Sequence, residues 1–542
     1  MNGITTVPYP ECEPILGYAP GSPEKVSLKK QLKKMMSEEI EIPIIIGGKE
    51  VRTGNLADCR CPHDHNHLLA RYHKAGPDEI KMAVDAAMEA WKTWSEMNWM
   101  SRAAIFLRAA ELLAGKYRDV LNGATMLGQS KTPHQAEIDS ACELIDFYRF
   151  NPFFMNQIYM EQPDSGPEVW NFLEYRALEG FIFAVTPFNF TSIAGNLPTS
   201  PTLMGNVCLW KPASSAVYSA YFLTQLWKEA GLPAGVINFV PGPGRYVGDP
   251  VIQQPEFGGV HFTGSTGVFN AMWKTIGENM SKYGRYPRIV GETGGKDFAF
   301  VHASADVKAT VTAILRGAFE YQGQKCSAAS RAYIPDSIWP KIKEMFIDEL
   351  KTLKMGDIND FTNFMGAVID KAAFSTITEY IDYAKSSPEA EILFGGGYDD
   401  SKGYFIEPTV VLTTNPRFRL MEEEIFGPVL TIYVYPENKF AETMKLCNET
   451  SPYALTGGIM ATDREAIIQA QKALRHASGN FYINDKITGA VVSQQPFGGA
   501  RASGTNDKAG SYLNLIRWAS VRTTKENFNP PTDYRYPYMG EK

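Results

Sequence analysis

The sequence predicts an α/β fold with two parallel sheets, and three observations lead to this prediction. Short runs of β-branched and aromatic residues alternate with longer helical segments between residues 178 and 290. A second stretch of the same kind begins at residue 297 and runs to about residue 484. An all-helical region, from about residue 77 to 151, precedes both. Strands that alternate with helices form βαβ units, so we expect each stretch to build one parallel sheet.

Composition excludes two classes of protein. The 542 residues are too many for one hydrophobic core, and 44% apolar with 21% charged residues is typical of globular interiors. The net charge is −7 and the basic residues are dispersed, so nucleic-acid binding is not expected. No apolar run approaches the roughly 20 residues that cross a bilayer, so we expect no membrane span.

The N-terminus and the cysteines indicate a reducing compartment. Acidic residues precede the first basic residue, Lys25, which is unlike a signal or transit peptide. The seven cysteines are an odd number without a Cys-x-x-Cys motif, a pattern typical of free thiols. We therefore expect a cytoplasmic protein.

Local signals mark the helices and strands in order. Pro77 with two acidic residues after it predicts a first helical turn, Ser101 predicts an N-cap, and residues 134–150 repeat apolar positions three and four apart. In the first alternating stretch we expect strands at 181–185, 206–210, 236–240 and 259–262. The second stretch begins with a strand at 297–301, and a helix follows at 306–321.

Two segments interrupt this pattern. Residues 152–176 contain proline and glycine, and the last thirty or so residues are rich in tyrosine and end in DYRYPYM. Both are expected to form interfaces rather than core.

Three side chains are candidates for catalysis. Cys326 lies in GQKCSAAS with small residues after it and basic neighbours, and positive potential would lower the pKa of its thiol. Glu292, in GETGGKDF, precedes glycines and could hold a water molecule, while Asn189, in TPFNF, could place its amide at an oxyanion. Taken one at a time, a structural thiol, a surface carboxylate and a strand-end asparagine are the commoner interpretations.

Glycines and hydroxyls follow several of the predicted strands. Lys211-Pro212 ends one strand, residues 263–267 (TGSTG) end another, and residues 241–244 (PGPG) end a third. Such turns at the carboxyl ends of parallel strands bind dinucleotides. The GxGxxG fingerprint is absent after the first strand, so each turn alone is weak evidence.

Six motifs together resemble one enzyme superfamily. TPFNF, WKP, FTGST, GETGG, GQKCS and EEIFGPV occur in the order and spacing of the aldehyde dehydrogenases, and the resemblance runs from about Ile42 to the C-terminus. It implies an α/β fold with a Rossmann-type NAD-binding domain, a second α/β catalytic domain and a small β flap for oligomerisation. The implied boundaries are 1–151 and 177–293 for the NAD-binding domain, 294–487 for the catalytic domain, 152–176 and 505–542 for the flap, and 488–504 for a substrate-anchoring loop.

The resemblance also implies a two-step reaction. Cys326 would attack the aldehyde and form a thiohemiacetal, whose oxyanion is held by the Cys326 amide and the Asn189 side chain while a hydride passes to the nicotinamide. Glu292 would then activate the water that hydrolyses the thioester. No metal is required.

The cofactor implied by the resemblance is NAD. Lys211 and Glu424 would bind ribose hydroxyls, and Phe426 would lie beside the nicotinamide riboside. Many NAD-specific relatives carry glutamate where this chain has Ser214, so some use of NADP is also expected. The remaining implied cofactor contacts are Thr186, Pro187, Phe188, Pro212, Ser214, Gly244, Thr263, Gly264, Ser265 and Glu292.

Longer strings resemble the 1-pyrroline-5-carboxylate dehydrogenase branch of the superfamily. They are QAEID at 135–139, GNFYINDKITGAVV at 479–492 and QQPFGGARASGTNDK at 494–508. The implied substrate is L-glutamate γ-semialdehyde, and an amino-acid head of this kind needs donors, an acceptor and aromatic walls. The implied contacts are Ser327 and the amides of Gly489 and Ala490 for the carboxylate, Phe190 and Phe497 for the methylenes, and Glu137 for the ammonium.

The sequence departs from the resemblance at one position and leaves other functions open. Ala490 stands where relatives often carry serine, which puts the affinity for substrate in doubt. Another acidic semialdehyde, such as that of succinylglutamate or of succinate, is the second hypothesis, and a non-enzymatic use of the fold is the third. His63, His65 and His67 could bind a metal on one strand face, but exposed strand histidines are favoured. A homo-oligomer, and a separate proline dehydrogenase as metabolic partner, are expected.

Overall fold

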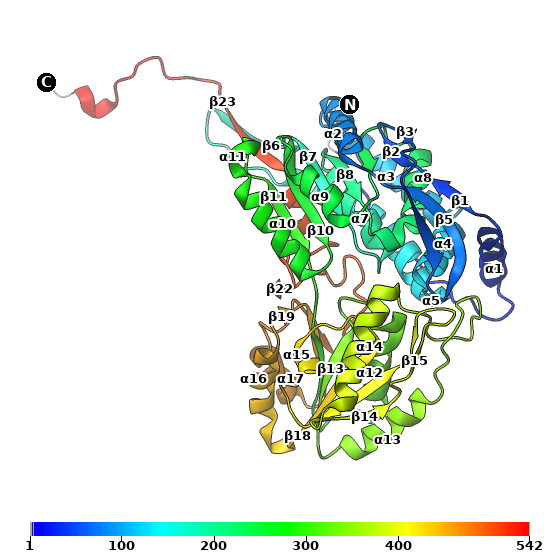
Figure 1. Ribbon diagram of the computed structural model, residues 1–542. Coiled ribbons are helices and arrows are strands. Elements are labelled where there is room, and N and C mark those ends of the chain that lie inside the picture. The colour runs from blue at the N-terminus through cyan, green and yellow to red at the C-terminus, as the bar shows by residue number, and fades with distance from the viewer. Residues whose placement is uncertain (1–2, 4, 541–542) are drawn as a thin grey trace.

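Two seven-stranded sheets organise the chain in the computed structural model, which describes residue 3 and residues 5–540 (Figure 1). The first sheet lies in the upper half of Figure 1 and the second in the lower half. The predicted boundary at residues 293 and 294 falls between β11, an edge strand of the first sheet, and β12, which lies in the second.

The first sheet has the order β11-β10-β7-β8-β9-β2-β3. Its first five strands are parallel, and β2 and β3 extend the edge in antiparallel fashion. The four strands predicted between residues 181 and 262 are confirmed to within two residues at each end. The strands are β2 (Ile44–Ile46), β3 (Lys49–Val51), β7 (Phe181–Val185), β8 (Val207–Lys211), β9 (Ile237–Phe239), β10 (Phe257–Thr263) and β11 (Arg288–Glu292).

Helices cover both faces of this sheet. The predicted start at Pro77 is confirmed, but the predicted N-cap at Ser101 is wrong, because Asn98 accepts the Met100 N–H and begins the helix earlier. The helical segments are α1 (Pro23–Met36), α2 (Pro77–Trp94), α3 (Trp99–Ala114), α4 (Arg118–Gln129), α5 (Pro133–Ala136), the π-helix η1 (Glu137–Glu143), α6 (Leu144–Met160), α7 (Thr191–Leu203), η2 (Ser214–Ala216), α8 (Val217–Ala230), α9 (Gly244–Ile252), α10 (Thr266–Glu278) and α11 (Met280–Tyr283).

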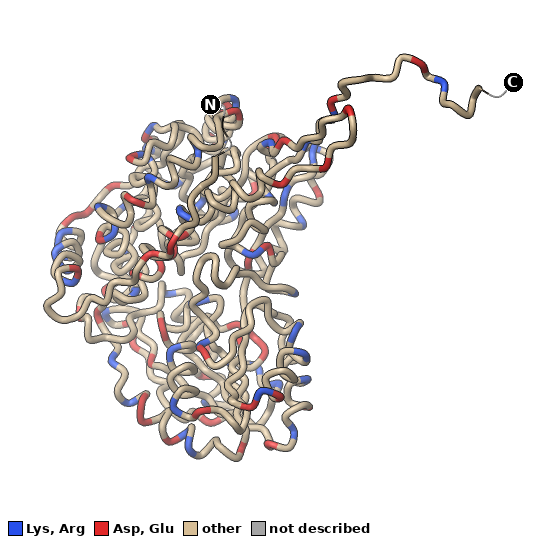
Figure 2. The backbone as a smooth tube through the Cα atoms, turned by 180° about the vertical axis from the view of Figure 1, so that it is seen from behind, with Lys and Arg blue, Asp and Glu red and all other residues tan. Residues whose placement is uncertain are grey.

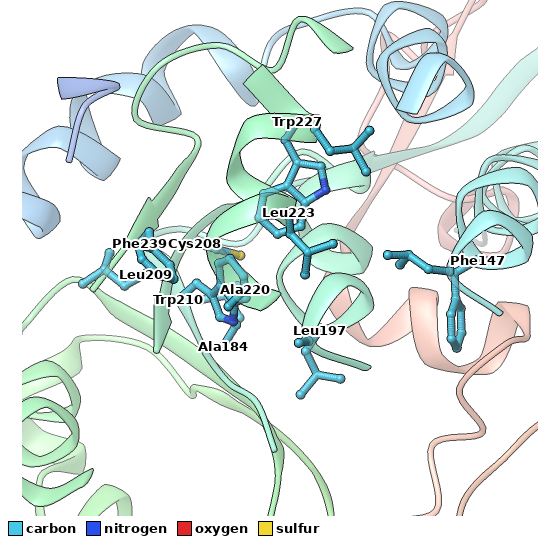
Figure 3. Close-up of a cluster of buried hydrophobic side chains, with 14 of the residues drawn as sticks. Phe147, Ala184, Leu197, Cys208, Leu209, Trp210, Ala220, Leu223, Trp227 and Phe239 are labelled. Atoms are coloured by element: carbon cyan, nitrogen blue, oxygen red, sulfur yellow. The ribbon is translucent and has the colours of Figure 1, made fainter. Parts of the chain in front are cut away.

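The core of this half forms where strands meet helices. Figure 3 shows Trp210 and Phe239 on the sheet and Leu223 and Trp227 on the covering helix α8. The Trp210 ring lies 5.0 Å from that of Trp227 and 5.2 Å from that of Phe239. The indole N–H groups are also satisfied, since Trp210 donates to Thr186 and Trp227 to Tyr148. Burial on both faces explains why these strands are continuous apolar runs.

A three-stranded sheet lies beside the first core and contains the histidine cluster. Its order is β1-β5-β4, from β1 (Ile40–Ile42), β5 (Asp64–His73) and β4 (Leu56–Cys61). The prediction of exposed histidines is wrong, because His63 is only 1% exposed and precedes the strand, and His65 and His67 are half-buried. Among the described residues, no group of three or more His, Cys, Asp or Glu side chains could hold a metal ion.

The second sheet has the order β14-β17-β18-β13-β12-β20-β21, and only β14 is antiparallel. Two separate clusters of apolar side chains cover its faces. Its strands are β12 (Asp297–Val301), β13 (Ala329–Pro335), β14 (Ala390–Phe394), β17 (Thr409–Thr413), β18 (Val429–Tyr435), β20 (Thr456–Met460) and β21 (Asn480–Ile483). The helices are α12 (Val307–Phe319), η3 (Glu320–Gly323), α13 (Trp339–Leu350), α14 (Lys371–Ser386), α15 (Arg419–Glu422), η4 (Glu437–Lys439), α16 (Phe440–Thr450) and α17 (Arg464–Ala473). Two short ribbons pair β15 (Tyr398–Asp399) with β16 (Phe405–Ile406) and β19 (Tyr453–Ala454) with β22 (Ala500–Arg501).

A two-stranded ribbon joins the two segments that were predicted as a flap. Strands β6 (Val169–Arg176) and β23 (Ser520–Asn527) pair antiparallel along their whole length. The predicted flap was too long, because residues 152–160 continue α6 and the segment 512–518, with α18 (Tyr512–Leu515) and η5 (Ile516–Trp518), packs into the first core. Beyond β23 the chain, ending in η6 (Pro537–Gly540), extends away from the body (Figure 1).

The surface agrees with the charge pattern of the sequence. Figure 2 shows acidic and basic residues interspersed over both halves. Within the described part of the chain, no helix combines the length and the apolar character that a bilayer crossing requires.

Candidate active site

Two cavities meet at Cys326, which lines both of them. The larger, with a volume of 640 Å³, lies against the carboxyl ends of β7, β8 and β10. The smaller, with a volume of 370 Å³, lies among η1, the start of α7 and the loop that follows β21. The thiol therefore faces two separate binding spaces.

Most of the predicted cofactor contacts line the larger cavity. Three residues do not: Pro212 and Ser214 are adjacent to its lining residue Ala213, and Glu292 precedes its lining residue Thr293. The predicted contacts that do line the cavity are Thr186, Pro187, Phe188, Lys211, Gly244, Thr263, Gly264, Ser265, Glu424 and Phe426.

The polar groups of this cavity fit a dinucleotide. The ammonium of Lys211 makes one hydrogen bond, to the Pro212 carbonyl at 3.1 Å, and burial lowers its pKa to about 8. Oε1 of Glu424 accepts the Gly295 N–H at 2.9 Å, and burial raises the pKa of this carboxyl to about 7. A Cβ at Gly294 would come within 2.1 Å of Oε2 of Glu424, so any side chain there would displace this carboxylate. Donor and acceptor thus remain available for ribose hydroxyls.

Cys326 is half-buried and is surrounded by carboxylates. It follows α12 and η3, and burial raises the pKa of its thiol well above the ordinary value, with the charge of Glu292 acting in the same direction. The prediction that basic neighbours lower this pKa is therefore wrong. The neighbouring ammonium of Lys325 points instead to Glu320, whose carboxylate lies at 2.9 Å.

Asn189 lies in the turn between β7 and α7 and is 3% exposed. Its side-chain amide donates to the Gln324 carbonyl at 3.1 Å, two residues before the thiol. An asparagine amide carries two N–H donors, so the second one is available toward the larger cavity that Asn189 lines.

Glu292 is the last residue of β11 and lies between the two halves of the chain. Its backbone pairs with Gly504, and its Oε1 atom is buried with no hydrogen-bond partner among the described residues. Burial raises the pKa of the carboxyl to about 8. The positive charge of Lys508 opposes this shift, and the negative charge of Asp507 adds to it. A carboxyl with such a pKa exchanges protons near neutral pH.

The smaller cavity contains five of the six predicted substrate contacts. Phe190, Ser327, Gly489, Ala490 and Phe497 all line it. The hydroxyl of Ser327 is 2.7 Å from that of Thr488, which ties the loop after β21 to the residue beside the thiol. The cavity therefore offers hydroxyl and backbone donors between two aromatic rings.

The structure does not bring Glu137 to this cavity. Its carboxylate, fully buried, accepts hydrogen bonds from Arg118, Tyr18, Asn122 and the Leu16 N–H. The expected contact with a substrate ammonium is therefore corrected, because these partners already occupy both oxygens.

Glu143 lines the cavity instead and was missed from the sequence. It ends the π-helix that Glu137 begins, so spacing based on an α-helix does not indicate which carboxylate faces inward. Burial raises its pKa to about 8, and Ser192 donates to it at 3.0 Å.

Lys131 is a second residue that the sequence did not single out. It is fully buried, its ammonium pairs with Asp139 at 2.8 Å, and it lies 4.1 Å from the centre of the Phe190 ring. Asp139 also accepts the backbone N–H groups of Thr191 and Ser192. This buried pair fixes the aromatic wall at the start of α7.

Comparison with known proteins gives full-length matches. A model of the aldehyde dehydrogenase family matches residues 50–523. The mitochondrial delta-1-pyrroline-5-carboxylate dehydrogenase of Dictyostelium discoideum is 55% identical over 536 residues, 98% of this chain and 96% of that protein. The protein of that name from Homo sapiens is 47% identical over 528 residues, 97% of this chain and 94% of its own.

A solved structure is equally similar. The crystal structure of the Delta-pyrroline-5-carboxylate dehydrogenase from Mycobacterium tuberculosis bound with NAD has a TM-score of 0.97 and 49% identity, with 100% of both chains covered. The similarity therefore includes the residues before Ile42, where the motifs had predicted it to begin.

Proposed function

The chain belongs to the aldehyde dehydrogenase family, and we infer that it oxidises L-glutamate γ-semialdehyde, the open form of 1-pyrroline-5-carboxylate, to L-glutamate with NAD. This is the second step of proline breakdown. The observation that carries the inference is the thiol shared by two cavities, one with the volume and polar groups for a dinucleotide and one suited to a short amino-acid aldehyde.

NAD would be held in the larger cavity by Lys211 and Glu424 at its riboses, with Phe426 beside the nicotinamide riboside. The bound dinucleotide supplies the acceptor for the hydride. Ser265, the N-cap of α10, and Gly264 lie where a helix N-terminus favours phosphate. Ser214 is uncharged at the edge of this cavity and would not repel a 2′-phosphate, so some NADP use is included.

Catalysis begins when the Cys326 thiol loses its proton to water and the thiolate attacks the aldehyde carbon. The free N–H of Asn189 and the Cys326 amide would stabilise the oxyanion of the thiohemiacetal. After the hydride has left, the thioester is hydrolysed by a water molecule that ionised Glu292 deprotonates. Each of these roles uses a group that the fold holds at or beside the junction of the cavities.

The substrate would be recognised by its amino-acid head. The Ser327 hydroxyl and the amides of Gly489 and Ala490 would bind the carboxylate, and Phe190 and Phe497 would enclose the methylenes. We assign the ammonium to Glu143 in place of Glu137. Ala490 offers only its backbone donor, which weakens binding without changing which substrate is chosen.

The test is NADH formation from glutamate semialdehyde by the intact protein and by Cys326→Ala. Activity that disappears in the variant supports both substrate and nucleophile. Oxidation of succinate semialdehyde with no activity on glutamate semialdehyde would refute the substrate, because that competitor lacks the ammonium assigned to Glu143. Glu143→Gln distinguishes the two substrates, since it should weaken binding of glutamate semialdehyde and leave binding of succinate semialdehyde unchanged.

A homo-oligomer, dimer or higher, is proposed from the exposed ribbon and tail. Trp170 on β6 is 56% exposed and its ring centre lies 5.4 Å from that of Phe172 on the same face of the ribbon, and the tail carries exposed Phe528, Tyr534 and Tyr538. Such a patch is typical of an interface. Light scattering should give a mass above one chain, and Trp170→Asp should reduce it.

A cytoplasmic location is proposed from the free thiols, all seven of which are unpaired. Several relatives are named as mitochondrial, so recovery with mitochondria on fractionation would contradict it. A separate proline dehydrogenase is proposed as the metabolic partner that forms 1-pyrroline-5-carboxylate. Coupled oxidation of proline by the two enzymes tests that link.

A further inference from the structure

The N-terminal arm, residues 5–22, runs along the smaller cavity before the first helix begins. Residues 5–19 contain no helix or strand, yet side chains of the first half of the chain accept their backbone N–H groups. Asn156 accepts from Val7, Asp146 from Glu13 and Glu137 from Leu16, at 2.7 to 2.9 Å. Side-chain oxygens therefore hold the backbone of the arm in place, without any pairing to a β-strand.

One carboxylate of the arm is held by two arginines. Glu13 lies 2.6 Å from Arg118 and 2.7 Å from Arg149, and all three side chains are largely buried. Arg118 also donates to the Pro14 carbonyl at 2.9 Å and pairs with Glu137. A charge-assisted network of this kind is stronger than an exposed ion pair.

The same network reaches the π-helix that ends at Glu143. The Tyr18 hydroxyl donates to Oε2 of Glu137 at 2.7 Å and accepts from Asn122 at 3.0 Å. Burial raises the pKa of Glu137, but Arg118 and the Leu16 N–H outweigh burial and hold it below its ordinary value. The ionised carboxylate therefore joins the arm to the first residue of η1.

The arm also contacts the opposite wall of the cavity. Cys12, Glu13 and Ile15 line the cavity, together with the loop after β21. The Gln494 amide lies 3.5 Å from the Cys12 sulfur, which is 4.0 Å from the Val492 carbonyl. The arm thus spans from the π-helix wall to the loop that carries the proposed carboxylate donors.

From this geometry we propose that the N-terminal arm is a wall of the substrate site, positioned by the network of Glu13, Arg118, Glu137 and Tyr18. The proposal rests on the proposed function for the identity of the substrate. The arm limits the length of aldehyde that fits and holds the π-helix and the loop at a fixed separation. Glu13 and Tyr18 are positioning residues, because they act through the wall and touch no reacting atom.

The variants are Glu13→Gln and Tyr18→Phe, which remove a charge and a hydroxyl while keeping the shape. Glu11→Gln is the matched control, since Glu11 is exposed on the same arm and has no ion pair among the described residues. We expect the KM for glutamate semialdehyde to rise about tenfold in Glu13→Gln and about threefold in Tyr18→Phe, with kcat and the KM for NAD nearly unchanged. The preference over the homologue with one more methylene should fall in both variants.

A second readout does not depend on the activity. Cys12 is partly exposed at the cavity, so its rate of alkylation, followed on its peptide by mass spectrometry, reports whether the arm is attached. L-Glutamate should protect Cys12 in the intact protein and in Glu11→Gln, and protection should be reduced in Glu13→Gln. If the intact protein shows no activity with glutamate semialdehyde, the proposed function fails but faster alkylation in Glu13→Gln alone still supports the arm. Equal KM, selectivity and alkylation in all three variants would overturn the proposal.

Discussion

Replacement of Glu292 by glutamine tests the assignment of the general base. The pKa of Glu292 is raised to about 8, so the ionised fraction is about 9% at pH 7 and about 91% at pH 9. If ionised Glu292 deprotonates the attacking water, thioester hydrolysis in the intact enzyme should rise about tenfold between these pH values. The sign follows from the raised pKa, because the base form exists only above it.

In Glu292→Gln the base is missing and hydrolysis should slow by about 10² to 10⁴-fold. Hydride transfer precedes hydrolysis, so rapid mixing with NAD and substrate should give a burst of one NADH per subunit and then a slow phase. The slow phase should lose the tenfold pH dependence. The burst rate should keep its own dependence on pH, since the pKa of the Cys326 thiol is also raised.

Cys326→Ser is the control, because it should show no burst. Glu292 would be excluded as the base by a slow phase in Glu292→Gln that still rises tenfold from pH 7 to pH 9. A steady-state rate equal to that of the intact enzyme would exclude it as well.

Three further substitutions test other parts of the site and fold. Asn189→Ala removes the proposed oxyanion donor and should slow NADH formation in the first turnover by about 10² to 10³-fold, as stopped-flow NADH absorbance will show; an unchanged first-turnover rate contradicts the role. Ser327→Ala should raise the KM for glutamate semialdehyde about tenfold and leave the KM for NAD unchanged in steady-state assays; equal effects on both would point to general damage. Trp518→Ala removes a fully buried indole and should reduce the free energy of unfolding by about 3–5 kcal/mol in urea titrations, whereas a loss below 1 kcal/mol would show that the site collapses without cost.

The sequence predicted the central strands well because the signal for each strand lies within the strand and its neighbouring residues. Phe181, Ile182, Phe183 and Ala184 are fully buried, so the run is apolar on both faces and is bounded by a glycine. The edge was not predictable in the same way. Ile45 pairs with Phe239, almost two hundred positions away, and only the folded chain brings this three-residue strand to its partner.

The electrostatics of the candidate site could not be predicted from the sequence. The motif order indicated Cys326, Asn189 and Glu292, and the fold places them at or beside the meeting point of the cavities. The pKa of the thiol could not be predicted from its neighbours in sequence, because burial and the distant carboxylate of Glu292 determine it. The sequence also indicated Glu137 at the smaller cavity where the structure places Glu143. The seven residues of π-helix change which side chains share a face, so spacing based on an α-helix gives the wrong carboxylate.

The two cores differ in how much of the chain must be synthesised before each is complete. The side chains of the second sheet's clusters all lie between residues 298 and 487, whereas the first core joins Tyr18 and Leu28 to Leu515 and Trp518. At ~5–20 residues per second, synthesis separates the two ends of the first core by roughly 25–100 s. The second core is complete once residue 487 has emerged, whereas the part of the first core that Leu515 and Trp518 cover stays exposed until the last helical turns are made.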